Sequence, residues 1–433
     1  MSHAVNDRYT TGFQGLEVGH EKYKQHVPEK QRKQPPPNYS QSIPIGTQYR
    51  FPGVNSRDEP VTREEAGIAE MQLSSSDRIL ICDRTGAGKT SLLKRIVYGL
   101  HEAGQKIIHL TDVKNDFADI DTEGGVPQEF IDEAGMHPGE SPGSIPVEVF
   151  QPRLLYNEYR RSPPDVLEGM ETFAYGFQDL RESEIKTLVN ATSDTQTDIL
   201  TNAIAAHDEL TYSSLEDTVL SIDANPQAKR SLMNSIRRLK EQEVLHDDYR
   251  EKLPADSLED GVVAVSMDNW DSFKREGREK LEIQIAIALR RIKHRLRDGD
   301  LKGPVTPIFD EAHVFCGEKN DISTPEIVDM IDLGRAYDIP MIFSSQRASQ
   351  LDQEIIDGLS HFFIGKNVPP DQRMDLLKAA DLVDHEDYST GKWTKIFREM
   401  EKYEFLQVDS ERSLWRVVSP FAPPCFHPWE DDE

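Results

Sequence analysis

Short apolar runs separated by helix-forming stretches dominate the chain from residue 76 onward. The run SDRILICD (76–83) is followed by an amphipathic stretch, TSLLKRIVYGLHEAG (90–104), and by a second apolar run, KIIHLTD (106–112). Apolar runs of this length predict buried strands, and the spacing between them predicts a helix that stops at Gly104. A strand–helix–strand unit predicts a parallel sheet and therefore an α/β fold.

The same alternation returns in the second half of the chain, where a long amphipathic stretch, REKLEIQIAIALRRIKHRLRDG (278–299), predicts another helix. A closing stretch, EFLQVDSERSLWRVVSP (404–420), predicts a hairpin. Five more apolar runs are typical of strands: VEVF (147–150), VVAVSM (262–267), VTPIFDE (305–311), PMIFSSQ (340–346) and HFFIGKN (361–367).

Helical patterns fill the region between the two sets of strands. Ser213-Ser214-Leu215-Glu216 fits a capping box, and QAKRSLMNSIRRLKEQE (227–243) is a basic amphipathic helix. We therefore expect a helical subdomain inserted into the sheet domain. The predicted organisation is a polar, Pro-rich and disordered tail or arm (1–75), two parts of the core (76–152 and 260–420), the helical insert (153–259) and an acidic tail (421–433).

Composition restricts the class of protein. The 433 residues include 77 acids and 50 bases, which gives a net charge of −27 and predicts an acidic surface of the kind found in proteins from halophilic sources. This balance argues against nucleic-acid binding over the whole surface but leaves room for a local basic channel. No apolar run is long enough to span a membrane, the first residues contain no signal core, and the three cysteines form no disulfide framework. The expected location is the cytoplasm, or the virion if the gene is viral.

The loop between the first strand and the first helix has the chemistry of a phosphate site. Residues 83–90 read D-R-T-G-A-G-K-T, close to the pattern GxxxxGK[ST] of nucleotide-binding P-loops. Glycines let the backbone N–H groups approach phosphates in front of a helix N-terminus, which predicts a nucleoside triphosphate as the ligand. Lys89 should reach the β- and γ-phosphates. The predicted nucleotide-binding residues are Asp83, Arg84, Thr85, Gly86, Ala87, Gly88, Lys89, Thr90 and Ser91.

Asp83 replaces the glycine that opens the usual pattern. This position turns the chain out of the strand and lies farther from the transferred phosphate than Gly88 does. Aspartate tolerates unusual backbone angles, and Arg84 offsets part of its charge. We therefore expect a working site, and the alternative is an inactive relic.

A second acidic motif supplies the remaining chemistry of an ATPase. PIFDEAH places Asp310 and Glu311 at the end of an apolar strand. Asp310, together with the Thr90 hydroxyl, is predicted to hold Mg²⁺, and Glu311 is predicted to act as the general base on the attacking water. One strand later, Gln346 is expected to orient this water or to sense the γ-phosphate.

Two arginines are candidates for stabilising the transition state in a neighbouring subunit. They are Arg335, in DLGRAYDIP, which is the first choice, and Arg347, which follows Gln346. Each of them could instead be a structural ion-pair partner.

The series DRTGAGKTS, HLTDVKNDF, PIFDEAHVF and IVDMIDLGRAYDIPMIFSSQRASQLDQEIIDGLSHFFIGK (327–366) resembles the HerA/FtsK superfamily of P-loop ATPases. The similarity covers residues 76–150 and 260–420, and it is greatest to HerA-like ATPases and to the motor domains of conjugative coupling proteins. It implies a RecA-like core, a hexameric ring and ATP-driven movement of double-stranded DNA. The sequence departs from the family at Asp83 and leaves no room for an N-terminal β-barrel.

The resemblance leaves the cargo and the process open. DNA transfer, packaging or processing would bring a relaxase, a portal or a nuclease as partner. The alternatives are a secretion or pilus ATPase that moves protein and a nucleotide-gated scaffold with little turnover. Two basic segments, Lys229–Lys240 and Leu289–Lys302, could contact DNA phosphates or could form charged helix faces with their own partners.

Overall fold

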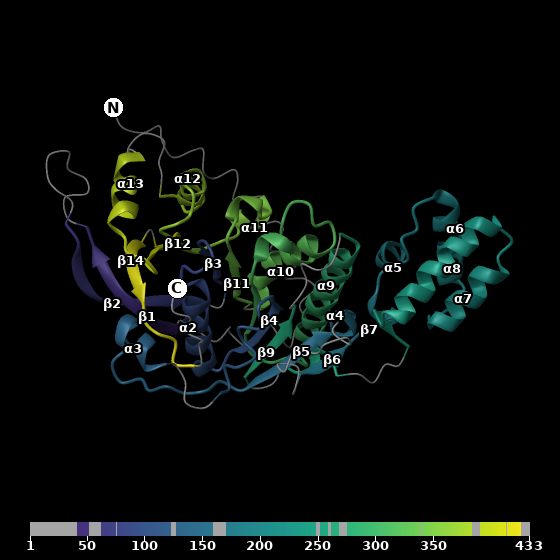
Figure 1. The fold of residues 1–433 in the computed structure, drawn as a ribbon, viewed down its shortest axis with the longest axis horizontal. Coiled ribbons are helices and arrows are strands. Elements are labelled where there is room, and N and C mark those ends of the chain that lie inside the picture. Colours follow the sequence, from purple (N-terminus) through teal and green to yellow (C-terminus); the bar gives the residue numbers. More distant parts are fainter. Residues whose placement is uncertain are drawn as a thin grey trace.

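The computed structural model describes residues 41–51, 62–74, 76–122, 127–158, 170–247, 252–258, 261–267, 275–337, 339–382, 390–412 and 414–425. Within these ranges one large sheet forms the centre of the molecule, and a group of helices extends from one end of it (Figure 1). No helix in the described part of the chain is long and apolar enough to cross a membrane.

The sheet is parallel over most of its width. Every neighbouring pair from β12 to β6 is parallel, whereas the pairs from β2 to β12 are antiparallel. The predicted α/β class is confirmed, and each apolar run named above forms a strand. In spatial order the strands are β2 (Glu64–Leu73), β1 (Gln41–Arg50), β14 (Leu414–Pro420), β13 (Phe405–Asp409), β12 (His361–Gly365), β3 (Arg78–Cys82), β11 (Met341–Ser345), β10 (Val305–Phe309), β4 (Lys106–Asp112), β9 (Val262–Ser266), β5 (Val147–Pro152) and β6 (Glu171–Phe173).

Helices cover both faces of the sheet, and the central strands are therefore buried on both sides. Alternate residues of a strand point to opposite faces. Ile79 and Ile81 of β3 therefore pack in one apolar cluster with α2, and Leu80 lies in the other cluster with the helices of the opposite face. The helices of the core are α2 (Lys89–Glu102), α3 (Gln128–Ala134), α4 (Arg153–Glu158), α9 (Arg275–Asp298), α10 (Ser323–Tyr337), α11 (Gln353–Asp357), α12 (Pro370–Ala379) and α13 (Thr390–Glu399).

The N-terminal strands correct the predicted boundary of the tail. β1 and β2 form an antiparallel hairpin, and β1 extends the main sheet by pairing with β14. Ile43, Ile45 and Met71 are buried in the cluster that contains α2, and Gly99 of α2 lets Ile43 approach the helix backbone. The prediction of a tail over residues 1–75 is therefore wrong for this hairpin, because a few alternating apolar residues suffice to attach a polar strand to an existing sheet. Residues 1–40 lie outside the described ranges.

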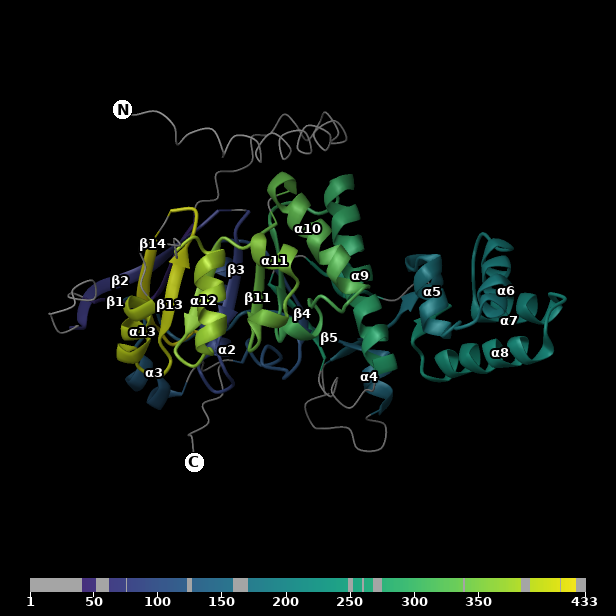
Figure 2. The ribbon, with the colours of Figure 1, turned by 90° about the horizontal axis from the view of Figure 1, so that it is seen from above.

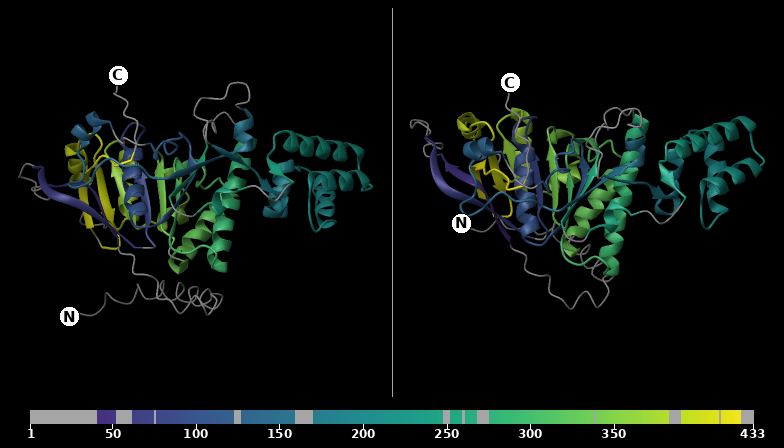
Figure 3. Two further views of the ribbon diagram at one scale, coloured as in Figure 1. Left: turned by 90° about the horizontal axis from the view of Figure 1, so that it is seen from below. Right: turned by 60° about the horizontal axis from the view of Figure 1, so that its bottom comes forward.

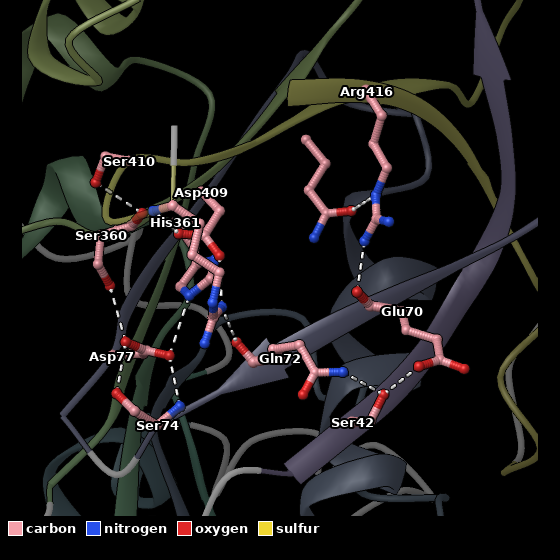
Figure 4. A network of polar contacts seen from close by, with 12 residues as sticks. Ser42, Glu70, Gln72, Ser74, Asp77, Ser360, His361, Asp409, Ser410 and Arg416 are labelled. Atoms are coloured by element: carbon pink, nitrogen blue, oxygen red, sulfur yellow. Dashed lines mark hydrogen bonds and ion pairs between the residues drawn. The ribbon is translucent and has the colours of Figure 1, made fainter. Parts of the chain in front are cut away.

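A polar network fixes this hairpin to the amino end of β3 (Figure 4). Buried Asp77 accepts hydrogen bonds from the Ser74 backbone N–H at 2.6 Å and from the Ser74 hydroxyl at 2.8 Å, and it contacts His361 Nε2 at 3.0 Å. Burial by itself would raise the pKa of Asp77, but the hydrogen bond and charge of His361 and the bonds from Ser74 outweigh it and lower that pKa. Arg416 of β14 donates to the Glu70 backbone carbonyl, so the network spans the hairpin, β12 and β14.

The helical insert lies beyond the β6 end of the sheet, opposite the N-terminal hairpin (Figures 2 and 3). Three of its helices begin at side-chain caps, Ser193 for α6, Thr211 for α7 and Asn225 for α8. The capping box expected at Ser213–Glu216 is therefore two residues too late, because Thr211 accepts the hydrogen bond from the Ser214 N–H. The insert contains β7 (Tyr175–Gly176), α5 (Glu182–Val189), α6 (Asp194–Ala205), α7 (Tyr212–Ser221), α8 (Pro226–Glu241) and β8 (Leu245–His246).

The insert is shorter than the predicted range of 153–259. α4 and β6 belong to the core, because β6 pairs with β5 in the main sheet. The predicted start of the insert at residue 153 is wrong because β6 has only three residues, Glu171–Phe173. A strand of this length is too short to give a strand pattern in the sequence.

Candidate functional site

The phosphate loop connects the carboxyl end of β3 to the first turn of α2. Gly86 and Gly88 have φ angles of 72° and 86°, in the left-handed region that favours glycine. α2 begins without a side-chain cap and has no acidic residue in its first turn. Its N-terminal N–H groups therefore face the loop without a side-chain cap or a first-turn acid among the described residues, an arrangement that suits phosphate binding.

Lys89 lies inside this loop rather than in solvent. It is buried, and its Nζ donates a hydrogen bond to the Arg84 backbone carbonyl at 3.0 Å. Burial lowers the pKa of Lys89, and the nearby carboxylates of Glu311 and Asp310 oppose that shift. The lysine is thus held by the loop itself, next to the acidic pair, in a position to exchange a carbonyl for phosphate oxygens.

Asp83 is built into the loop through the neighbouring strand. Its side chain is buried, and its Oδ1 accepts hydrogen bonds from the N–H groups of Arg84 at 2.7 Å and Asn367 at 3.1 Å. Its φ angle is not in the left-handed region, so the freedom of glycine is not needed there. The carboxylate occupies the space beside Gly365 of β12, where a Cβ atom would lie 1.9 Å from Oδ2. Asp83 and Gly365 are therefore a matched pair.

This pairing predicts a coupled double substitution. Gly365→Ala should lower the free energy of unfolding by about 2 kcal/mol, because the added methyl displaces the Asp83 carboxylate from its two N–H donors. In an Asp83→Gly background the same change should cost at least about 1 kcal/mol less. Urea denaturation of the four proteins measures this coupling. Gly143→Ala is the control, since nothing lies within 4 Å of its Cβ position; equal costs in both backgrounds would contradict the pairing.

The acidic pair follows β10, two strands away from β3 in the sheet. Burial raises the pKa of Asp310 to about 6; the charge of Glu311 adds to this shift, and a hydrogen bond with Ser344 opposes it. Glu311 adopts a left-handed backbone conformation with φ 45°. Such a conformation is costly for a residue with a Cβ, and it is found where the direction of a side chain matters.

Gln346 joins the acidic pair to the phosphate loop. Its Oε1 accepts a hydrogen bond from the Thr85 hydroxyl at 2.8 Å, and its Nε2 donates to Glu311 Oε1. Glu311 Oε2 is buried and accepts no hydrogen bond from the described residues; His313 Nδ1 lies 3.5 Å from it. Gln346 therefore holds Glu311 through Oε1, and Oε2 is left without a hydrogen-bond donor among the described residues.

The predicted Mg²⁺ ligands fit this ion through one hydroxyl and one carboxylate. The Thr90 hydroxyl donates to Asp116 Oδ2 at 3.2 Å, and Asp310 lies at the same edge of the sheet. No group of three His, Cys, Asp or Glu side chains in the described residues could hold a metal by itself. Mg²⁺ usually keeps several waters and takes its other ligands from substrate phosphates, so these few protein ligands suit the ion when it arrives with ATP.

Sequence reasoning missed Asp116, which contacts Thr90. Buried Asp112 accepts hydrogen bonds from the N–H groups of Asp116 and Phe117, each at 3.0 Å, and thereby shapes the turn after β4. Burial raises the pKa of Asp112 to about 8, and the charge of Asp116 adds to the shift. Asp116 could have been predicted from its place in the fold. The segment DVKNDF follows a parallel strand, and the carboxyl end of that strand meets those of β3 and β10 at one edge of the sheet.

The two candidate arginines lie at opposite edges of the sheet. Arg347 is exposed beside Gln346 and lines, with Arg84 and Thr85, a surface hollow of about 610 Å³. Arg335 lies in the last turns of α10, whose Ile331 carbonyl accepts a hydrogen bond from Arg78 at the start of β3. Its backbone is therefore at the edge opposite the loop, and its side chain is outside the described residues. Within one chain, Arg347 adjoins the site.

The basic segments differ in how their charges are used. In α9, Arg290 pairs with Glu184 at 2.7 Å, and Arg291 pairs with Asp179 at 2.7 Å, so these arginines join the core to the insert. In α8, Lys229 donates to the Leu220 carbonyl at 2.6 Å. The exposed cations of α8 are Arg230, Arg237, Arg238 and Lys240.

No family model and no curated protein matches this chain. The solved structure of VirB4 of Thermoanaerobacter pseudethanolicus is similar at 11% identity, with a TM-score of 0.54 over 90% of this chain and 98% of VirB4. The bacterial conjugative coupling protein TrwB (12% identity, TM-score 0.49, 90% and 96% of the chains) and B204, the DNA-packaging ATPase from Sulfolobus turreted icosahedral virus (13% identity, TM-score 0.35, 80% and 99%), are also similar.

Of these three likenesses, the one to VirB4 is strong enough to establish a shared fold. The match covers 90% of this chain and 98% of VirB4. The chain therefore has the fold of VirB4, which agrees with the RecA-like P-loop NTPase core expected from its sequence.

Proposed function

We propose that this protein is an ATP-hydrolysing motor of the HerA/FtsK type that translocates double-stranded DNA and acts as a homo-oligomeric ring, with six subunits as the expected number. The observation that carries the proposal is the hydrogen-bonded connection from Thr85 through Gln346 to Glu311. This connection links the phosphate loop to the proposed general base. A relic site that only binds nucleotide would not need such a connection.

Each residue of the site then has one task in hydrolysis. Lys89 and the N–H groups of the loop and α2 bind the phosphates. Thr90 and Asp310 would hold Mg²⁺, which would supply positive charge to offset that of the phosphates. Gln346 orients the attacking water, and Glu311 Oε2 accepts its proton. At least one of the two arginines, Arg335 or Arg347, stabilises charge in the transition state of a neighbouring subunit. The proposed place of action is the cytoplasm, or a virus particle if the gene is viral.

Duplex DNA is favoured as the cargo by the sequence resemblance and by the exposed cations of α8. A ring that repeats Arg230 and Arg238 in every subunit would contact several DNA phosphates even though the chain is strongly acidic overall. The ion-paired arginines of α9 are assigned to structure instead. Conjugation would join the motor to a relaxase, packaging to a portal, and repair to a nuclease.

Stimulation of ATP hydrolysis by linear duplex DNA tests this function. We expect turnover to rise several-fold with duplex DNA and the stimulated part to fall as salt increases, because DNA binding releases counterions. The salt series should extend to molar KCl, since the acidic composition is typical of halophilic proteins. Arg230→Glu combined with Arg238→Glu should remove the stimulation and leave basal turnover unchanged.

The outcomes separate the two alternatives. Turnover without stimulation at any salt concentration would favour a secretion or pilus motor that moves protein. Binding of ATP without turnover would favour a nucleotide-gated scaffold. Mass measurement with ATP tests the ring, and a chain that remains monomeric while it hydrolyses ATP at full rate would contradict a role for either arginine in a neighbouring site.

A further inference from the structure

A tyrosine far from the sequence motifs lies directly against the phosphate loop. Tyr403, in the turn between α13 and β13, has its Cδ1, Cβ and Cγ atoms 3.3, 3.6 and 3.8 Å from the position that a Cβ atom on Gly88 would take. Its ring is half-buried, and the exposed Lys402 lies over it with Nζ 4.6 Å from the centroid. The contact brings an aromatic side chain to the turn that leads into α2.

The order of the strands decides which end of a nucleotide meets this ring. Glu311 and Gln346 follow β10 and β11, which lie on one side of β3, whereas β12 and β13 lie on the other side. The γ-phosphate must face the general base, so the opposite end of the nucleotide leaves the loop toward β12 and β13. Tyr403, immediately before β13, is on that side.

The turn that carries Tyr403 is held from several directions. The side chain of buried Glu404 accepts a hydrogen bond from the Glu401 N–H at 2.7 Å, and Arg63 bonds to the carboxylates of both glutamates. Lys366, at the end of β12, donates to the Met400 carbonyl. The ring is therefore fixed relative to the phosphate loop before a ligand arrives, which lowers the entropic cost of binding.

Tyr403 is also an unusual residue for its backbone conformation. Its φ angle is 68°, where glycine or asparagine would hold the turn with less strain than an aromatic residue. Strain of this kind is retained where a side chain serves a purpose that the turn alone does not need.

We propose that Tyr403 is the stacking platform for the nucleobase of the bound nucleoside triphosphate. The proposal rests on the function proposed above and adds its base subsite. Stacking on an aromatic face tolerates any base, so the site should accept both purine triphosphates with similar affinity. The contact with Lys402 does not prevent this, because an exposed cation–π contact is weaker than base stacking and the lysine stem is flexible.

Binding of Mg²⁺–ATP and of inorganic tripolyphosphate, measured by calorimetry, tests the assignment. Tyr403→Asn keeps a residue suited to the left-handed turn and removes the ring. We expect its ATP affinity to fall about tenfold and its tripolyphosphate affinity to change less than about twofold. Tyr403→Phe should retain the ATP affinity of the parent. Tyr98→Ala, which removes a half-buried tyrosine further along α2, is the control and should leave both affinities unchanged.

Two results would overturn the assignment. Unchanged ATP affinity in Tyr403→Asn would show that the ring does not touch the base, and equal losses for ATP and tripolyphosphate would show that Tyr403 only shapes the loop. Failure of the nucleotide site is distinguishable from both, since the parent protein would then bind neither ligand. A failure of turnover or of DNA stimulation would leave the ATP and tripolyphosphate affinities of the parent intact.

Discussion

Glu311→Gln is expected to bind ATP as tightly as the parent protein and to hydrolyse it about 10²–10⁴-fold more slowly. An amide cannot accept the proton of the attacking water, whereas its oxygen can still accept the hydrogen bond from Gln346 Nε2 that fixes the side chain. The change therefore removes the base and preserves the arrangement around it. Phosphate release in single turnovers gives the rate, and calorimetry gives the affinity.

The matched control is Glu318→Gln, which makes the same change at an exposed position beyond the 3₁₀ turn that follows Glu311. It should leave the rate unchanged. A Glu311→Gln protein that hydrolyses ATP at the parental rate would exclude this carboxylate as the base and would remove the central step of the proposed mechanism.

Lys89→Ala should reduce ATP affinity at least about tenfold and hydrolysis by about 10²–10³-fold, because it deletes a charged donor aimed at the phosphates. Lys89→Met should behave in the same way while filling the buried space that the lysine stem occupies. Agreement between the two variants would assign the loss to the ammonium group. Equilibrium binding of Mg²⁺–ATP and steady-state turnover measure the two effects.

Lys378→Ala removes an exposed lysine from α12 and serves as the control. Thermal unfolding of the variants without ligand checks that the fold is retained. Equal ATP binding by the parent and by both Lys89 variants would mean that the loop is not a nucleotide site, and the motor interpretation would then fail.

Local pattern was enough to predict the strands and helices that surround the loop. Continuous apolar runs such as residues 78–82 and 305–309 form strands that are buried on both faces, and this burial is what made them visible in the sequence. The sequence pattern did not predict the hairpin β1–β2, because buried and exposed residues alternate in its strands, which are only partly buried. Its position depends on β14, which lies more than 340 residues away along the chain.

The residues of the candidate site form two groups in the same way: those that a local motif predicts, and those that only the fold brings to the site. Lys89, Thr90, Asp310 and Glu311 were identified because their spacing within short motifs reflects a chemistry that needs those residues. Asp116 was missed because it carries no motif. The choice between Arg335 and Arg347 stays a prediction, because the sequence does not show at which edge of the sheet a helix ends.

The sequence by itself determined a parallel α/β core, a phosphate loop and an acidic pair after a later strand, since each depends on residues that are neighbours along the chain. Tertiary structure alone decided that Asp83 fits beside Gly365, that the arginines of α9 are used in ion pairs, and that Tyr403 lies against Gly88. The physical reason is that these contacts join segments brought together by the order of strands in the sheet, and that order is fixed by long-range packing rather than by local periodicity.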